Sequence, residues 1–81
     1  MPYITEVTRR ELVHDKVTPH SAGELNYLIT KLILAYSAEK GRTYTTFNEV
    51  VGALECCKQE FYRRVVVPYE EEKRKENGDV Y

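Results

Sequence analysis

The sequence predicts an all-α fold in which an antiparallel helical hairpin follows a short N-terminal helix. Three observations lead to this prediction. Apolar residues recur at helical spacing in two long segments. Each of these segments opens with a residue pattern that caps a helix start. The connection between them is only a few residues long, which makes two helices antiparallel neighbours.

The first predicted helix is short and runs from Thr5 to about His14. It is polar, with few apolar residues to anchor it. The segment 15–20 is predicted to be a connector, because Pro19 disfavours a helical conformation at Thr18.

The second predicted helix covers residues 21–41. It begins with a capping box in which the hydroxyl of Ser21 faces Glu24 three residues on. Gly41 supplies the expected stop. The helix carries an apolar stripe made of Leu25, Leu28, Ile29, Leu32, Ile33 and Tyr36.

The third predicted helix covers residues 46–67 and begins with a second capping box, Thr46 and Glu49. Pro68 removes a backbone donor and crowds the preceding turn, so the helix must kink or end there. We favour a kink, followed by a charged, solvated helical extension over residues 69–76. The stripe of this helix consists of Phe47, Val50, Val51, Leu54, Cys57, Phe61 and Val65.

The whole chain of 81 residues is interpreted as one small helical domain. Leu54 and Phe61 are expected to be core positions, although such a hairpin encloses its own apolar surface poorly. Tyr27 and Leu34 add apolar surface on the side of the second helix opposite its stripe, and Val66 and Val67 extend the apolar surface of the third helix round from Val65. Gly52 would let another backbone approach closely. The sequence therefore predicts that the chain assembles into an oligomeric helical bundle.

Composition excludes several classes of partner. Apolar residues make up 42% of the chain and charged residues 31%, which is typical of a globular protein. A formal net charge of -1 provides no overall attraction for nucleic acid or anionic lipid. No apolar run approaches the roughly 20 residues of a membrane span. The N-terminus lacks the pattern of a signal peptide, so we expect a cytoplasmic protein.

Two adjacent cysteines, Cys56 and Cys57, lie in the middle of the third predicted helix. Neighbouring helical residues point about 100° apart, so a disulfide between these two is implausible. Two ligands also do not make a zinc site. We expect reduced packing cysteines, with Cys56 directed away from the stripe and available for a subunit contact.

The residues that would support catalysis are not arranged for it. His14 and His20 both fall in the weak N-terminal region, and the glycines are too scattered to form a phosphate loop. In size and helicity the chain resembles the all-α nucleoside triphosphate pyrophosphohydrolases, which bind magnesium through carboxylate pairs on facing helices. Here Glu49, Glu55 and Glu60 are spaced so that they do not converge. We therefore expect no catalytic residue, no metal site and no cofactor.

Lys58 is the most unusual residue, because it falls within the apolar stripe, about 20° from Phe47 on a helical wheel. Glu55 precedes it by three residues and Tyr62 follows it by four, so all three can meet on one edge. Asn26 of the second helix is expected to reach them across the hairpin. This group is either an ordinary surface ion pair beside a snorkelling lysine or a polar pocket for a small ligand at a subunit seam.

A second candidate is the run Tyr62-Arg63-Arg64. Two guanidinium groups beside an aromatic ring suit a phosphate contact with stacking on a base. The alternative is that the arginines are solvated and pair with neighbouring glutamates. The candidate ligand-binding residues are therefore Lys58, Tyr62, Arg63, Arg64, Asn26 and Glu55.

Several motifs carry a family resemblance. They are Pro2-Tyr3-Ile4, Ala22-Gly23-Glu24-Leu25-Asn26-Tyr27, Tyr62-Arg63-Arg64, Pro68-Tyr69-Glu70 and Asn77-Gly78-Asp79-Val80-Tyr81. Together they resemble a small family of uncharacterised bacteriophage and bacterial proteins, a domain of unknown function of about this length. This resemblance implies no activity and no site residue.

The architecture alone is similar to that of small helical phage proteins that sequester cyclic nucleotide signals of bacterial defence. This likeness favours a nucleotide-binding oligomer and implies nothing more. We therefore expect a non-enzymatic, oligomeric phage accessory protein that binds a phosphorylated small molecule or a host protein, in the host cytoplasm. The alternative is a structural or protein-interaction bundle with no small ligand. A magnesium-dependent pyrophosphohydrolase is disfavoured.

Overall fold

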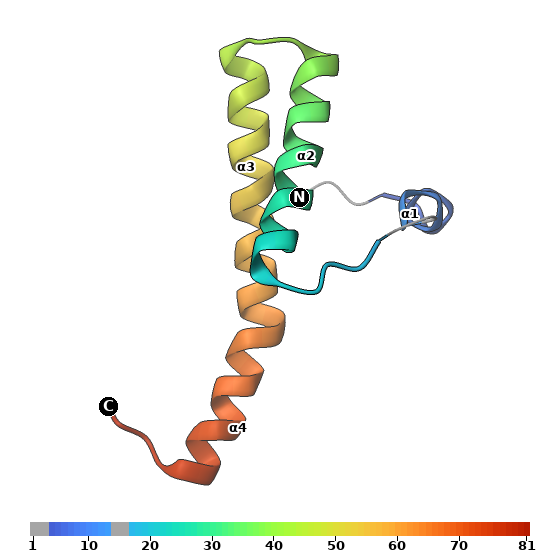
Figure 1. Cartoon of the computed structure of the whole chain (residues 1–81). Helices are drawn as coiled ribbons and strands as arrows, with labels where there is room; N and C mark the ends of the chain where they lie inside the picture. Colours follow the sequence, from blue (N-terminus) through green and yellow to red (C-terminus); the bar gives the residue numbers. More distant parts are fainter. Residues whose placement is uncertain (1–3, 14–16) are drawn as a thin grey trace. The chain divides into compact units, whose positions relative to one another are not determined.

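The computed structural model describes residues 4–13 and 17–81, and within these ranges the fold is all-α, as predicted, without a strand. The chain divides into two compact units, Met1–Val50 and Val51–Tyr81, which are described separately. The helices are α1 (Glu6–Val13), α2 (Ala22–Lys40), α3 (Tyr44–Phe61) and α4 (Val67–Asn77), and a π-helical turn, Tyr62–Val66, lies between the last two (Figure 1).

Helix α1 is a short polar helix held by local bonds. The hydroxyl of Thr5 accepts a hydrogen bond from the backbone N–H of Thr8 at 3.2 Å, and Arg10 pairs with Glu6 one turn earlier. This pattern is a capped helix start, although Thr5 was expected to be helical itself. His14, at the predicted end, lies outside the described residues.

Helix α2 begins and ends as the sequence predicts. The side chain of Ser21 accepts a hydrogen bond from the backbone N–H of Glu24 at 3.1 Å, and the Glu24 carboxylate accepts one from the backbone N–H of His20 at 2.8 Å. At the other end Gly41 has φ 101°, a conformation that favours glycine. Its N–H donates to the carbonyl of Ser37 at 2.9 Å, which closes the last turn.

The predicted capping box of the third helix is wrong. Helix α3 starts at Tyr44, and its cap is Thr43, whose hydroxyl accepts a hydrogen bond from the backbone N–H of Thr46 at 3.2 Å. Thr46 is therefore inside the first turn, and it is buried, with only 3% of its surface exposed. Glu49 does not reach back to the helix start, because its carboxylate accepts a hydrogen bond from the Tyr36 hydroxyl at 2.7 Å.

Within the first unit, this bond joins α2 to the first turns of α3, which lie side by side in Figure 1. The two bonded residues are thirteen positions apart in the chain. The carboxylate of Glu49 raises the pKa of Tyr36 above its ordinary value, mainly because the hydrogen bond requires the protonated hydroxyl. The hydrogen bond between Tyr36 and Glu49 therefore connects the two helices near the bend, in addition to the bend itself.

In the second unit, the helix continues past Pro68 through a π-turn. Proline has no N–H and its ring crowds the carbonyl four residues earlier, so a regular helix would be strained at this point. The backbone N–H of Val67 instead bonds the carbonyl of Tyr62, five residues back, which widens the helix by one residue. Helix α4 then runs to Asn77 and stops at Gly78, where φ is 85°.

The expected core is not present among the described residues. None of their hydrophobic side chains is buried, and Leu54 and Phe61 keep 39% and 59% of their surfaces exposed. The prediction that these two residues form an intrachain core is therefore wrong. The reason is geometric, because a single continuous helix from residue 51 to residue 77 has no second element in its own unit to cover its stripe.

Candidate functional site

The polar cluster around Lys58 forms only in part. The ammonium of Lys58 lies 3.1 Å from the Glu55 carboxylate, with the two side chains 70% and 50% exposed. The side-chain amide of Gln59 donates to the same carboxylate at 3.1 Å. The hydrogen bond from Gln59 and then the charge of Lys58 lower the pKa of Glu55. This geometry is that of a solvated ion pair along one helix edge.

Two arginines share one carboxylate at the start of the π-turn. Arg63 pairs with one oxygen of Glu60, and Nε of Arg64 donates to the other oxygen at 2.8 Å. Arg63 above all, and then Arg64, hold the pKa of Glu60 below its ordinary value. We call these three residues the arginine clamp. Their guanidinium groups converge on a single anionic group, which here belongs to the chain itself.

Tyr62 bonds away from Lys58. Its hydroxyl donates to the carboxylate of Glu70 at 3.0 Å, which raises the pKa of Tyr62. Residues seven apart share a face in a regular helix, whereas these two are eight apart. The extra residue of the π-turn brings them onto one face. From the sequence, we expected Tyr62 to meet Lys58 and Glu55. The hydrogen bond described for the Tyr62 hydroxyl goes to Glu70 instead.

Asn26 belongs to the other compact unit. It lies on α2, where its backbone oxygen accepts a hydrogen bond from the hydroxyl of Thr30 at 2.8 Å. The structure thus brings the candidate residues together in two local groups, Glu55 with Lys58 and Arg63 with Arg64. From the sequence, we expected two groups that share Tyr62, with Asn26 in the first of them.

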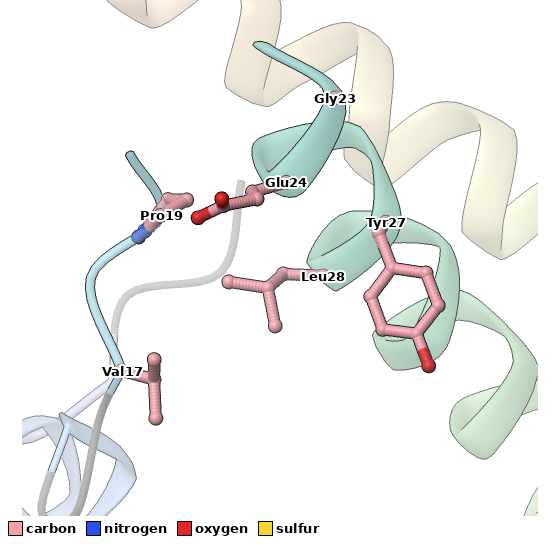
Figure 2. A pocket seen from close by; sticks show the side chains of 6 residues that line it. All are labelled: Val17, Pro19, Gly23, Glu24, Tyr27 and Leu28. Atoms are coloured by element: carbon pink, nitrogen blue, oxygen red, sulfur yellow. The ribbon is translucent and has the colours of Figure 1, made fainter. Parts of the chain in front are cut away.

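A hollow that the sequence analysis missed opens beside the start of α2. It has a volume of about 260 Å³. Figure 2 shows Leu28 and Val17 on either side of the space and the Tyr27 ring at its edge. Its lining is mostly apolar, and the nearby Glu24 carboxylate already accepts the backbone N–H of His20. Its lining residues are Val17, Pro19, Gly23, Glu24, Tyr27 and Leu28.

Cys56 and Cys57 are both free thiols and both exposed. The expectation that they are packing residues is therefore not met within the described part of the chain. They lie on the same exposed stretch of α3 as the polar cluster. Each remains available for a contact outside the chain.

Residues 1–80 match the family model described as Domain of unknown function (DUF6899). The chain belongs to the DUF6899 family. Comparison with curated proteins and with solved structures yields no match. The membership confirms the resemblance to an uncharacterised family, and it assigns no role to any residue of this DUF6899 chain.

Among the residues that the structure describes, no group of three or more histidine, cysteine or acidic side chains is placed to hold a metal ion. None of the helices in these ranges combines the length and apolar character of a membrane span. The cationic side chains of both local groups already pair with carboxylates. Many of the large apolar side chains, in contrast, are exposed.

Proposed function

We propose that this DUF6899 chain is a non-enzymatic helical module whose role is to assemble with further copies of itself. One observation supports the proposal most strongly. Among the described residues, Thr46 is the one buried side chain, while large apolar residues of α2, α3 and α4 stay exposed. Exposed apolar surface on this scale marks an interaction site rather than a finished monomer surface.

The energetics point the same way. Ordering the backbone costs about 1–2 kcal/mol per residue, and burial of apolar area is the main term that offsets this cost. Burial within the described part of the chain is too small to do so. Association with another copy would supply the missing burial, since it covers the exposed stripes. Folding and assembly would then be one coupled process.

Sedimentation and circular dichroism over a range of concentrations test this proposal. We expect an oligomer at micromolar concentration and a helical signal that falls on dilution, because the helices lose their cover when the subunits separate. A chain that sediments as a monomer and keeps its full helicity on dilution would contradict self-assembly.

A second candidate function, binding of a phosphorylated small molecule, is favoured by the arginine clamp. Two guanidinium groups that share the Glu60 carboxylate are placed to share a phosphate instead. We propose this as a role of an assembled phage accessory protein in the host cytoplasm, where the ligand would be a linear or cyclic nucleotide signal of host defence. Lys58, Tyr62, Glu55 and Asn26 remain candidate contributors in the assembly.

Titration calorimetry against a panel of linear and cyclic nucleotides tests the ligand proposal. Glu60→Gln should strengthen binding, since it removes the competing anion, and the double variant Arg63→Ala, Arg64→Ala should abolish it. Arg74→Ala is the matched control, because Arg74 pairs with Glu71 one turn away from its own position. Titrations without heat for both the natural chain and Glu60→Gln would leave self-assembly alone, and turnover of a nucleotide would overturn both proposals.

A further inference from the structure

The apolar stripe of α3 follows a heptad pattern with one residue too many. Phe47, Val50, Leu54, Cys57 and Phe61 are spaced three, four, three and four residues apart, as in the seam of a coiled coil. The next apolar residues, Val65 and Tyr69, follow at steps of four and four. In a regular helix this extra residue would rotate the stripe away from its line.

The π-turn lies where the extra residue occurs. It covers Tyr62–Val66, and its wider turn accommodates one residue more than an α-helical turn. The hydrogen bond from Tyr62 to Glu70 is independent evidence, because it places residues eight apart on one face. Phe61, Val65 and Tyr69 are thereby kept in line. They are 59%, 52% and 57% exposed, so the second unit presents an unbroken apolar face.

We propose that this face pairs with the same face of a second copy, antiparallel, with the two-fold axis passing through the π-turn. The inference rests on the proposed self-assembly and adds the surface and its orientation. In this arrangement Phe61 packs against the partner's Val65, and Cys57 packs against the partner's Tyr69. Residues 57–69 of the two copies pair with each other. The two π-turns lie opposite each other in this segment, so the apolar stripes of both helices stay aligned.

Charge complementarity favours the antiparallel orientation. The antiparallel pairing puts Lys58 on the same edge as the partner's Glu70 and Glu60 on the same edge as the partner's Arg64, so each edge carries opposite charges. A parallel, in-register pairing that continued beyond Tyr69 would stack Glu72 and Glu76 on the same residues of the partner, because these two continue the stripe. Like charges placed face to face disfavour that arrangement.

Cysteine cross-linking tests the orientation with residues that the chain already holds. In the variant Cys56→Ser, Tyr69→Cys, Cys57 should face the new cysteine of the partner, and mild oxidation should convert most of the chain to a covalent dimer. The matched control is Cys57→Ser, Tyr69→Cys, which keeps Cys56 instead. Cys56 points about 100° away from the stripe, so this control should not form the dimer.

A second measurement leaves Tyr69 unchanged. A spin label on Cys56, in the variant Cys57→Ser, should lie about 20 Å from its counterpart along the helix axis in the antiparallel pair. In a parallel pair the two labels would be at the same height. Rapid cross-linking through Cys57 alone in the variant Cys56→Ser, or labels at the same height, would overturn the antiparallel arrangement while leaving self-assembly intact. A monomer in sedimentation would overturn both.

Discussion

The two compact units differ in what holds them together. The first unit has a bond between residues far apart in the chain, from Tyr36 to Glu49, next to the Thr43 cap. The side-chain bonds described for the second unit join residues at most eight positions apart along one helix. Local bonds of this kind determine where a helix bends or ends, but they contribute little to keeping it folded. Under the proposed self-assembly, the second unit would therefore depend most on association.

The largest expected effect is the difference between a charge placed on the apolar face of the second unit and one placed away from it. Val65→Glu places a charge on the apolar face, and it should weaken association by about 3–5 kcal/mol, a hundredfold or more, because the charge is buried without a partner. Sedimentation and dilution-dependent circular dichroism measure this loss. Val67→Glu is the matched control, since Val67 lies off the stripe, and it should change little. Equal effects of both variants would contradict the assignment of the face.

The next prediction separates helix stability from assembly. Pro68→Ala restores a backbone donor and removes a helix-breaking residue that costs about 3 kcal/mol inside a helix. We expect the π-turn to revert to a regular helix, which rotates Tyr69 out of the stripe. Helicity per assembled chain should hold or rise, whereas association should weaken about tenfold or more. Unchanged sedimentation with raised helicity would show that the π-turn has no part in the interface.

Deleting one residue should reverse that loss. When Arg63 is removed in the Pro68→Ala background, Phe61 and Val65 become three residues apart and the heptad spacing is regular again. Association should return toward that of the natural chain. The control is the same deletion with Pro68 retained, which should weaken association, because the π-turn then has no extra residue to accommodate. Failure of the rescue would mean that the extra residue serves another purpose.

A smaller effect is expected at the bend of the first unit. Thr43→Ala removes the hydroxyl that caps α3, and it should cost about 1 kcal/mol. Thermal unfolding measures this change. Thr45→Ala is the matched control, because Thr45 is an exposed residue within the helix and alanine favours helix there. A larger loss for Thr45→Ala would contradict the placement of the cap.

The smallest effect is one of pH. The pKa values of Tyr36 and Tyr62 are both raised by carboxylates, so the protonated tyrosines favour the folded state. Their contribution to stability is complete below the ordinary tyrosine pKa of 10.0 and is lost as the pH rises through the folded values. In an absorbance titration that follows tyrosinate formation, two deprotonation steps should occur above the ordinary tyrosine pKa. Tyr36→Phe and Tyr62→Phe should each remove one of these steps. Tyr44→Phe, at an 86% exposed position, should leave both.

Much of the fold was predictable because helix starts and stops are local. Ser21 with Glu24, and Gly41, act through residues within one or two turns of themselves, so their roles are visible in the sequence. The error at Thr46 has the same origin. Thr43 and Thr46 are three residues apart, and the geometry of the bend decides which of the two hydroxyls caps the helix.

The candidate site was less predictable because its bonds depend on a change of helical register. The pair Glu55 and Lys58 was found, since three-residue spacing holds in any α-helix. The bond from Tyr62 to Glu70 was missed, because it exists only if one turn is wider than the rest. The hollow beside α2 was missed for a different reason, since Val17 and Pro19 belong to a connector whose path no periodicity describes.

The near absence of buried side chains among the described residues would, under the proposed self-assembly, affect how much of this protein survives in a cell. Proteases cut chains in proportion to the time that these spend open, and a chain with so little burial would be open whenever it is alone. Each newly made copy would then be protected only once it meets another. Because encounters rise with the square of concentration, the surviving amount should grow more steeply than the rate of synthesis. Low expression would leave almost none, and a modest increase in translation would leave a great deal.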